Sequence, residues 1–220
     1  TTPDTATRVI SITVNDGIKN SAVVTRAIAL SIPVPSVSGI TTASDTGSSA
    51  SDGITLNTQP TFIGTAQAGS TVTVYVDAVS VGTTTADGSG AWSFTPPGVL
   101  SEGSHLVSAM ATLGGVNSVI SASASVVIDT TAPAVPTGIA LTAATDTGAS
   151  HSDGVTNNNQ PSLAGTATAG SLVTVYIDGT AVGTTTADGS GAWQYAVPAP
   201  LLDGTHAVRA TATDTAGNVS

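Results

Sequence analysis

The twelve-residue stretch VGTTTADGSGAW occupies positions 81–92 and recurs unchanged at 182–193. The two copies are 101 residues apart, and the same offset aligns residues 45–106 with 146–207 without a gap, giving 38 identities in 62 positions. A period of about 100 residues is too long for a solenoid repeat and matches the size of one β-sandwich domain. The chain therefore contains two tandem domains of one kind.

Alternating residue patterns within each copy predict β-strands. Val72, Val74 and Val76 fall on one face of the segment TVTVYV (71–76), and the second copy keeps the pattern. Alternation with β-branched residues is typical of a strand with one buried face. Residues 104–112 and 119–128 are expected to add two more strands to the first copy. No segment combines helical spacing with helix caps.

Turn sequences separate these expected strands. The sequence ADGSG (86–90, and its copy at 187–191) predicts a tight turn, because glycine accepts a positive φ and aspartate bonds its own backbone. Short strands with turn signals every 8–12 residues are typical of a sandwich. The expected fold class is therefore all-β, with tandem Ig-like β-sandwiches joined end to end.

Three segments follow from the position of the repeat. Residues 1–33 contain RVISITVNDGIKNSAVVTRAIAL, which predicts two strands joined by a turn at Asn15–Gly17. Two strands cannot bury a core alone, so this segment is assigned to the end of a preceding domain of another kind, a partial β-domain. Residues 34–131 form the first repeat. Residues 132–220 form the second repeat, which is expected to lack its last strand.

Composition excludes several classes of function. The 220 residues carry a formal net charge of −10, with one lysine, three arginines and no cysteine. A nucleic-acid-binding protein needs a basic surface, and an acidic chain is not attracted to an anionic membrane. No apolar run approaches the roughly 20 residues of a membrane span, so no membrane insertion is expected. Disulfides and thiolate chemistry are excluded by the lack of cysteine.

The sequence gives no indication of an enzyme. None of the patterns G-x-S-x-G, H-E-x-x-H or the phosphate-binding P-loop occurs. His105 and His206 are equivalent in the two repeats, and a duplicated histidine beside a glycine turn is expected to be structural. His151 has no counterpart in the first repeat and is expected to be an exposed loop residue.

A group of aspartates lies near the boundary between the repeats. Asp129 follows the last expected strand of the first repeat, and Asp146 and Asp153 lie in an early loop of the second. Residues 128–154 contain no lysine or arginine to neutralise them. Calcium binds six to eight oxygens with flexible geometry, which suits such a group if the three side chains converge. The alternative is that all three are solvated loop residues.

The combination GTA-AGS-VTVY-D-VGTTTADGSGAW, L-DGTH, ATATDTAGNVS and IDTTAP resembles the bacterial Ig-like domains repeated in giant adhesins. These are type I-secreted RTX and biofilm-associated adhesins of Gram-negative bacteria, and the resemblance covers roughly residues 35–220. The ITVNDG segment is similar to the end of a cadherin-like domain of such proteins. The resemblance implies calcium at the domain joints, which stiffens an extracellular stalk.

Carried over residue by residue, the resemblance points to Asp129, Asp146, Asp153 and Asp214 as calcium ligands. Asp45 and Asp52 are the equivalent acids of the first repeat. At the first joint, however, Ile28 occupies the position that matches Asp129, which puts a calcium site there in doubt.

The expected function is that of a structural extender, a stalk of a secreted cell-surface adhesin that serves cell adhesion or biofilm formation. Its expected partners are the neighbouring Ig-like domains of the same chain. Two alternatives remain open: a module that binds a glycan or a protein, and an accessory domain of a secreted enzyme. The 61% identity that follows from 38 matches in 62 positions disfavours a dedicated binding site in one repeat.

Overall fold

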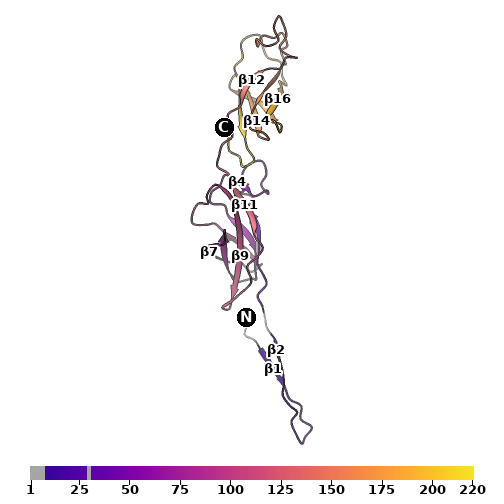
Figure 1. Ribbon diagram of the computed structural model, residues 1–220, viewed down its shortest axis with the longest axis vertical. Helices are drawn as coiled ribbons and strands as arrows, with labels where there is room; N and C mark the ends of the chain where they lie inside the picture. The colour runs from indigo at the N-terminus through magenta and orange to yellow at the C-terminus, as the bar shows by residue number, and fades with distance from the viewer. Residues whose placement is uncertain (1–7, 29–30) are drawn as a thin grey trace. The chain divides into compact units, whose positions relative to one another are not determined.

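The computed structural model describes residues 8–28 and 31–220. Within these residues the named elements of secondary structure are all β-strands, which confirms the expected all-β class (Figure 1). No helix in this part of the chain is long and apolar enough to cross a membrane.

The strands follow the repeat. Those of the N-terminal hairpin and the first repeat are β1 (Arg8–Ile12), β2 (Val24–Ile28), β3 (Ser36–Ile40), β4 (Ile54–Thr55), β5 (Phe62–Thr65), β6 (Thr71–Val76), β7 (Val79–Thr85), β8 (Ala91–Phe94), β9 (Gly103–Leu113), β10 (Val116–Asn117) and β11 (Ala124–Ile128). Those of the second repeat are β12 (Thr137–Leu141), β13 (Ser162–Thr166), β14 (Leu172–Ile177), β15 (Thr180–Thr186), β16 (Ala192–Ala196) and β17 (Val208–Thr213).

The chain forms two compact units whose boundary differs from that of the sequence repeats. The first unit holds the described residues up to Ser44 together with Gln59–Val127. The second unit holds Asp45–Thr58 and Ile128–Ser220. Residues 45–58, which belong to the first repeat in sequence, therefore belong in space with the second repeat.

Each repeat consists of two antiparallel sheets. In the first repeat, one sheet has the order β3-β5-β8 and the other the order β4-β11-β9-β6-β7, with β10 paired to β9. In the second repeat the corresponding sheets are β12-β13-β16 and β15-β14-β17. The alternation seen in the sequence orients β6: Val72, Val74 and Val76 are buried, while the residues between them are not.

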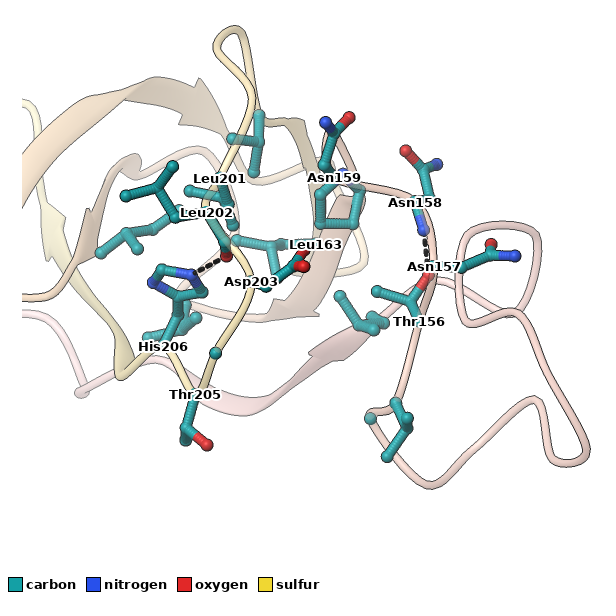
Figure 2. Close-up of a pocket in the computed structure, with 18 of the residues that line it drawn as sticks. Thr156, Asn157, Asn158, Asn159, Leu163, Leu201, Leu202, Asp203, Thr205 and His206 are labelled. Atoms are coloured by element: carbon teal, nitrogen blue, oxygen red, sulfur yellow. Dashed lines mark hydrogen bonds between the residues drawn. The ribbon is translucent and has the colours of Figure 1, made fainter.

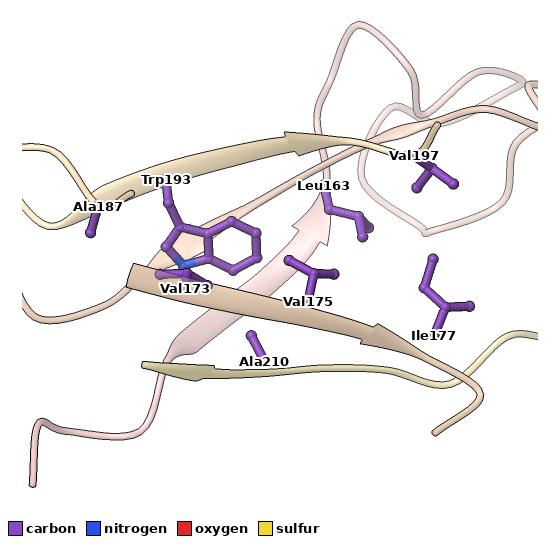
Figure 3. Close-up of a cluster of buried hydrophobic side chains, with 8 residues drawn as sticks. All are labelled: Leu163, Val173, Val175, Ile177, Ala187, Trp193, Val197 and Ala210. Atoms are coloured by element: carbon purple, nitrogen blue, oxygen red, sulfur yellow. The ribbon is translucent and has the colours of Figure 1, made fainter. Parts of the chain in front are cut away.

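The core of the second repeat is formed by apolar side chains from both of its sheets. Val173, Val175 and Ile177 of β14 face Leu163 of β13 and Trp193 of β16 (Figure 3). Gly165 makes room for the tryptophan, because a β-carbon there would be 2.6 Å from the indole ring. Trp193 is thus a core residue, and Trp92 is equally buried in the first repeat.

The ADGSG turns form as expected in both repeats. One carboxylate oxygen of Asp87 accepts hydrogen bonds from the Ser89 hydroxyl at 2.7 Å and the Ala91 amide at 3.0 Å, and Asp188 does the same one repeat later. The Ser89 hydroxyl, followed by the Ala91 and Ser89 amides, lowers the pKa of Asp87 below its usual value. These two aspartates act as turn residues.

The expected strand at residues 119–128 is shorter in the structure. Only Ala124–Ile128 pairs as a strand, β11. In the segment that precedes it, two serine side chains accept hydrogen bonds from β9. The Ser118 and Ser121 hydroxyls accept the amides of Ala111 and Ala109, each at 3.0 Å. A side-chain hydroxyl thus replaces the backbone partner that a continuous strand would supply.

The N-terminal hairpin is confirmed for the described residues. β1 and β2 pair antiparallel from Arg8↔Ile28 to Ile12↔Val24, and Gly17 at φ +93° lies in the turn between them. Apolar side chains such as Ile10, Ile12 and Ile18 are exposed. These three apolar side chains are therefore not part of a core. The assignment of residues 1–33 to a preceding domain stays a prediction, and residues 1–7 and 29–30 lie outside the described part.

Candidate functional site

Residues 45–58 and 146–159 form two equivalent loops, here called the first and second acidic loops. In the first, Asp45 Oδ2 accepts the Gly53 amide at 3.1 Å and Asp52 Oδ1 accepts the Ile54 amide at 3.0 Å. In the second, Asp146 and Asp153 make the same bonds, at the same distances, to the amides of Gly154 and Val155. The aspartates therefore shape both loops from within.

One carboxylate oxygen in each loop is buried and has no hydrogen-bond partner. Asp45 is 6% exposed and Asp146 is 2% exposed, and in both residues it is Oδ1 that lacks a partner. A buried carboxylate oxygen without a partner is costly, so such an atom indicates a water molecule or a cation beside it. This is the observation in the structure that fits a cation.

The first acidic loop packs against residues 214–218, here called the 214–218 turn. The Thr46 hydroxyl donates to Ala216 O at 2.8 Å, and the Ser48 amide donates to Thr215 O at 3.3 Å. A β-carbon on Gly47 would overlap Thr215 O, so glycine is required for this approach. The loop comes from the first repeat and the turn follows the last strand of the second.

Asp129 contacts both the first acidic loop and the 214–218 turn. Its amide donates to Thr55 O at 2.9 Å, and its carbonyl accepts from Asn218 Nδ2 at 2.8 Å. Asn218 Nδ2 also donates to Asp214 Oδ2 at 2.9 Å. Asp129 and Asp214 are thus brought together through Asn218, beside the first acidic loop that carries Asp45 and Asp52.

The structure does not bring Asp146 and Asp153 to Asp129. Asp214 follows Thr213, which pairs with Leu172 at one end of β14. Residues of the second acidic loop line a pocket with Ile177 and Val208, which pair at the other end. Six residues of strand separate the two ends by about 17 Å. The prediction that Asp146 and Asp153 lie near Asp129 rested on their closeness in the chain. In the folded second repeat, the loop that carries them lies at the opposite end of the sandwich.

The acidic side chains beside Asp129 are occupied by turn bonds. Asp129 Oδ1 accepts the Thr131 amide at 3.1 Å, and Asp214 Oδ1 accepts the amides of Gly217 and Asn218. Among residues 8–28 and 31–220, no three histidine or acidic side chains are grouped so that they could hold a metal ion. Beside Asp129, Asp45 Oδ1 is the carboxylate oxygen that is both buried and without a hydrogen-bond partner, and carbonyl or water oxygens could add further ligands for a cation.

The repeat-equivalent histidines each bond an aspartate, a contact that the sequence analysis missed. His105 Nδ1 is 2.7 Å from Asp77 Oδ2, and its Nε2 is 2.9 Å from Ser101 O. His206 makes the same bonds to Asp178 and Leu202 O, at 2.6 and 2.9 Å. The conservation of both members at the 101-residue offset was the signal that could have paired them.

The protonation of these pairs follows from their contacts. The Leu106 amide, and after it His105, lowers the pKa of Asp77, and His206 followed by the Ala207 amide lowers that of Asp178. Burial lowers the pKa of His105, but the Ser101 carbonyl and Asp77 together outweigh it and raise the pKa above 6.5. The Leu202 carbonyl, followed by Asp178, raises the pKa of His206. Each pair therefore favours its doubly charged form.

His151 lies in the second acidic loop, as expected, with Nδ1 2.7 Å from the carbonyl oxygen of Asp146. Arg209, the basic residue of the second repeat, lies over the Tyr176 ring at 4.2 Å from its centroid. Its guanidinium thus contacts an aromatic face.

The sequence of each repeat matches one protein family, the bacterial Ig-like domain, over residues 31–130 and 132–220. Because these matches cover most of the chain, the protein belongs to the bacterial Ig-like domain family. No curated protein matches the chain.

Several solved structures are also similar to the chain. Fibronectin(III)-like modules of Clostridium thermocellum CbhA are 19% identical, with a TM-score of 0.42, and the match covers 76% of this chain and 82% of that one. A tetra-tandem repeat in the extending region of a large adhesion protein is 24% identical over 91% of this chain and 50% of that one, with a TM-score of 0.35. The BSP domain of a biofilm-associated protein is 19% identical over 86% and 28%, with a TM-score of 0.28. The chain thus spans half or less of the two adhesion-related chains.

Proposed function

We propose that this chain is a structural extender of a bacterial cell-surface adhesin, and that its repeats hold an adhesive part away from the cell. Membership of the bacterial Ig-like domain family supports a role built from repeated sandwiches. The net charge of −10 supports a solvated surface that resists self-association. In this proposal the chain is extracellular, catalyses no reaction and has the neighbouring Ig-like domains as its partners.

The single observation that carries the proposal is the contact between the first acidic loop and the 214–218 turn. The loop is attached to β3 and β5 of the first repeat, and the turn is attached to β17 of the second. Hydrogen bonds from Thr46 and Ser48, and the close approach at Gly47, hold the two together. A contact of this kind limits movement at the connection, as an extender requires.

NMR relaxation of the backbone amides tests this role, with the rotational correlation time determined separately for each repeat. We expect the two repeats of the intact chain to tumble with one common correlation time. Gly47→Ala should separate the two values, whereas Gly148→Ala should not, because Gly148 has only the Val155 carbonyl within reach, at 3.9 Å. Independent tumbling in the unaltered chain would contradict the proposal.

Calcium is a second part of the proposal. We infer that a calcium ion lies beside the first acidic loop, with Asp45 Oδ1 as its protein carboxylate ligand and carbonyl or water oxygens completing its coordination. The buried and unpartnered state of this oxygen supports the inference. Bound there, the ion would offset the charges of Asp52, Asp129 and Asp214 around the connection. The equivalent oxygen of Asp146 offers one ligand in the second acidic loop.

A further inference from the structure

A pocket of about 590 Å³ opens in the second repeat, between the second acidic loop and residues 201–208 (Figure 2). Its lining includes the core residues Leu163, Ile177 and Val197. Large apolar side chains at its rim are exposed to solvent, with Val155 67% and Leu202 85% exposed. The core of this repeat is therefore open on one side.

The first repeat carries a strand at the equivalent place. There β11 lies between β4 and β9, and its Val126 and Ile128 are fully buried. With the offset of 101, β4 corresponds to residues 155–156 and β9 to residues 204–214. These are the two segments that border the pocket of the second repeat.

Both borders differ from the first repeat as expected for strands that have no neighbour. Residues 155–156 form no strand, and β17 begins at Val208, whereas β9 begins at Gly103, the equivalent of Gly204. Val208 is partly exposed, and its equivalent Val107 is fully buried. The pocket therefore lies between the edge of β17 and a segment, residues 155–156, that forms no strand here but pairs in the first repeat, and its base is apolar. An exposed strand edge beside an apolar base is the feature of a site for β-strand addition.

Ser220 shows how a strand would enter this pocket. Its amide donates to Ala212 O at 3.0 Å, and its hydroxyl accepts the Ala212 amide at 2.9 Å. Ser118 makes the same two bonds to Ala111 in the first repeat, at 2.8 and 3.0 Å. From Ser118 the chain reaches the start of β11 at Ala124, so a segment joined to Ser220 can reach the pocket by the same path.

We propose that this pocket is a β-strand acceptor site, and that its occupant is an extended segment with the Val-x-Ile-Asp pattern of residues 126–129, joined to Ser220 in the same polypeptide. The two apolar side chains fill the space between Leu163 and Val208. The aspartate then lies beside Thr156, as Asp129 lies beside Thr55. It brings a third carboxylate to the loop that holds Asp146 and Asp153. This inference does not depend on the proposed extender role.

Hydrogen exchange measured on a lengthened chain tests the proposal. The sequence of residues 119–129 is added after Ser220, and a matched control carries V126D and I128D within the added copy. We expect the amides of Val155, Thr156 and Val208 to exchange at least about tenfold more slowly in the lengthened chain than in the 220-residue chain. The unfolding midpoint of the second repeat should rise by about 5 °C or more. The control should show neither change.

Two further measurements distinguish the source of the strand. A free peptide of residues 119–129 should protect the same amides of the 220-residue chain, and it should not bind the lengthened chain, whose site is filled. Unchanged exchange in the lengthened chain would overturn the proposal. So would a concentration-dependent dimer of the 220-residue chain with the same amides protected, because the strand would then come from a second copy.

Discussion

Gly47 lies directly against the carbonyl oxygen of Thr215, so closely that no side chain fits between them. The equivalent glycine of the second acidic loop, Gly148, has a similar positive φ, but a β-carbon there would meet only the Val155 carbonyl oxygen, at an ordinary contact distance of 3.9 Å. The two positions are thus matched in backbone conformation, with φ of +98° and +122°, and differ in their contacts. A comparison of substitutions at the two glycines therefore separates the cost of backbone strain in the loop from the cost of lost packing against the 214–218 turn.

Gly47→Ala should therefore destabilise the protein more than Gly148→Ala. Both substitutions place a β-carbon in a region that favours glycine, which costs about 1–3 kcal/mol. Only Gly47→Ala adds an overlap with the 214–218 turn, which costs about a further 1–3 kcal/mol. Urea unfolding of the two variants measures the difference, and equal losses would mean that the loop does not pack on Thr215 in solution.

The repeat made the fold predictable, because a period of 101 residues, alternating valines and ADGSG turns all indicate the same sandwich. The position of the acidic loops was not predictable in this way. Asp129 and Asp146 are 17 residues apart in the chain, yet the segments that carry them lie at opposite ends of β14. Strand order and direction decide which loops meet, and neither could be derived from residue patterns within one loop. The contact of Asp129 with Asn218 depends on a turn 89 residues away.

The turns between β6 and β7 and between β14 and β15 offer a reciprocal pair of substitutions. Ala78 has φ +66°, a left-handed conformation that costs alanine about 1 kcal/mol relative to glycine, and Gly179 occupies the equivalent position at φ +82°. Ala78→Gly should stabilise the first repeat by about 0.5–1 kcal/mol, and Gly179→Ala should destabilise the second by a similar amount. Calorimetry of both variants measures the shifts, and shifts of the same sign would contradict the turn geometry.

The His105–Asp77 and His206–Asp178 pairs predict a fall in stability as the pH rises above 6.5. The pKa of each histidine is raised above 6.5 in the folded chain, so each bound proton stabilises the fold fully below pH 6.5. That contribution is lost as the pH rises through the raised pKa. The lowered pKa of each aspartate works in the other direction: its contribution is present above pH 3.8 and is lost as the pH falls further. Stability from these pairs is therefore greatest between about pH 4 and 6.5.

Urea midpoints at pH 5.5, 6.5 and 8 check this window. The unaltered chain should lose stability from pH 6.5 to 8, and a variant with both His105→Gln and His206→Gln should lose much less. His151→Gln is the matched control, because His151 bonds a backbone carbonyl and has no aspartate carboxylate partner among its hydrogen bonds. If the double variant keeps the full pH dependence, another group is responsible.

Asparagine at Asp45 should have opposite effects in the presence and absence of calcium. Without calcium, Asp45→Asn removes a buried charge whose Oδ1 lacks a partner and leaves an oxygen to accept the Gly53 amide, so the unfolding midpoint should stay the same or rise. With calcium, the unaltered chain should gain about 2.7 kcal/mol at a concentration 100 times the dissociation constant, and the variant should gain much less. Asp203→Asn removes an exposed charge and should keep the full calcium response. If EDTA and calcium give one midpoint for the unaltered chain, the oxygen of Asp45 is solvated by water, and no calcium ion stabilises the contact between the first acidic loop and the 214–218 turn.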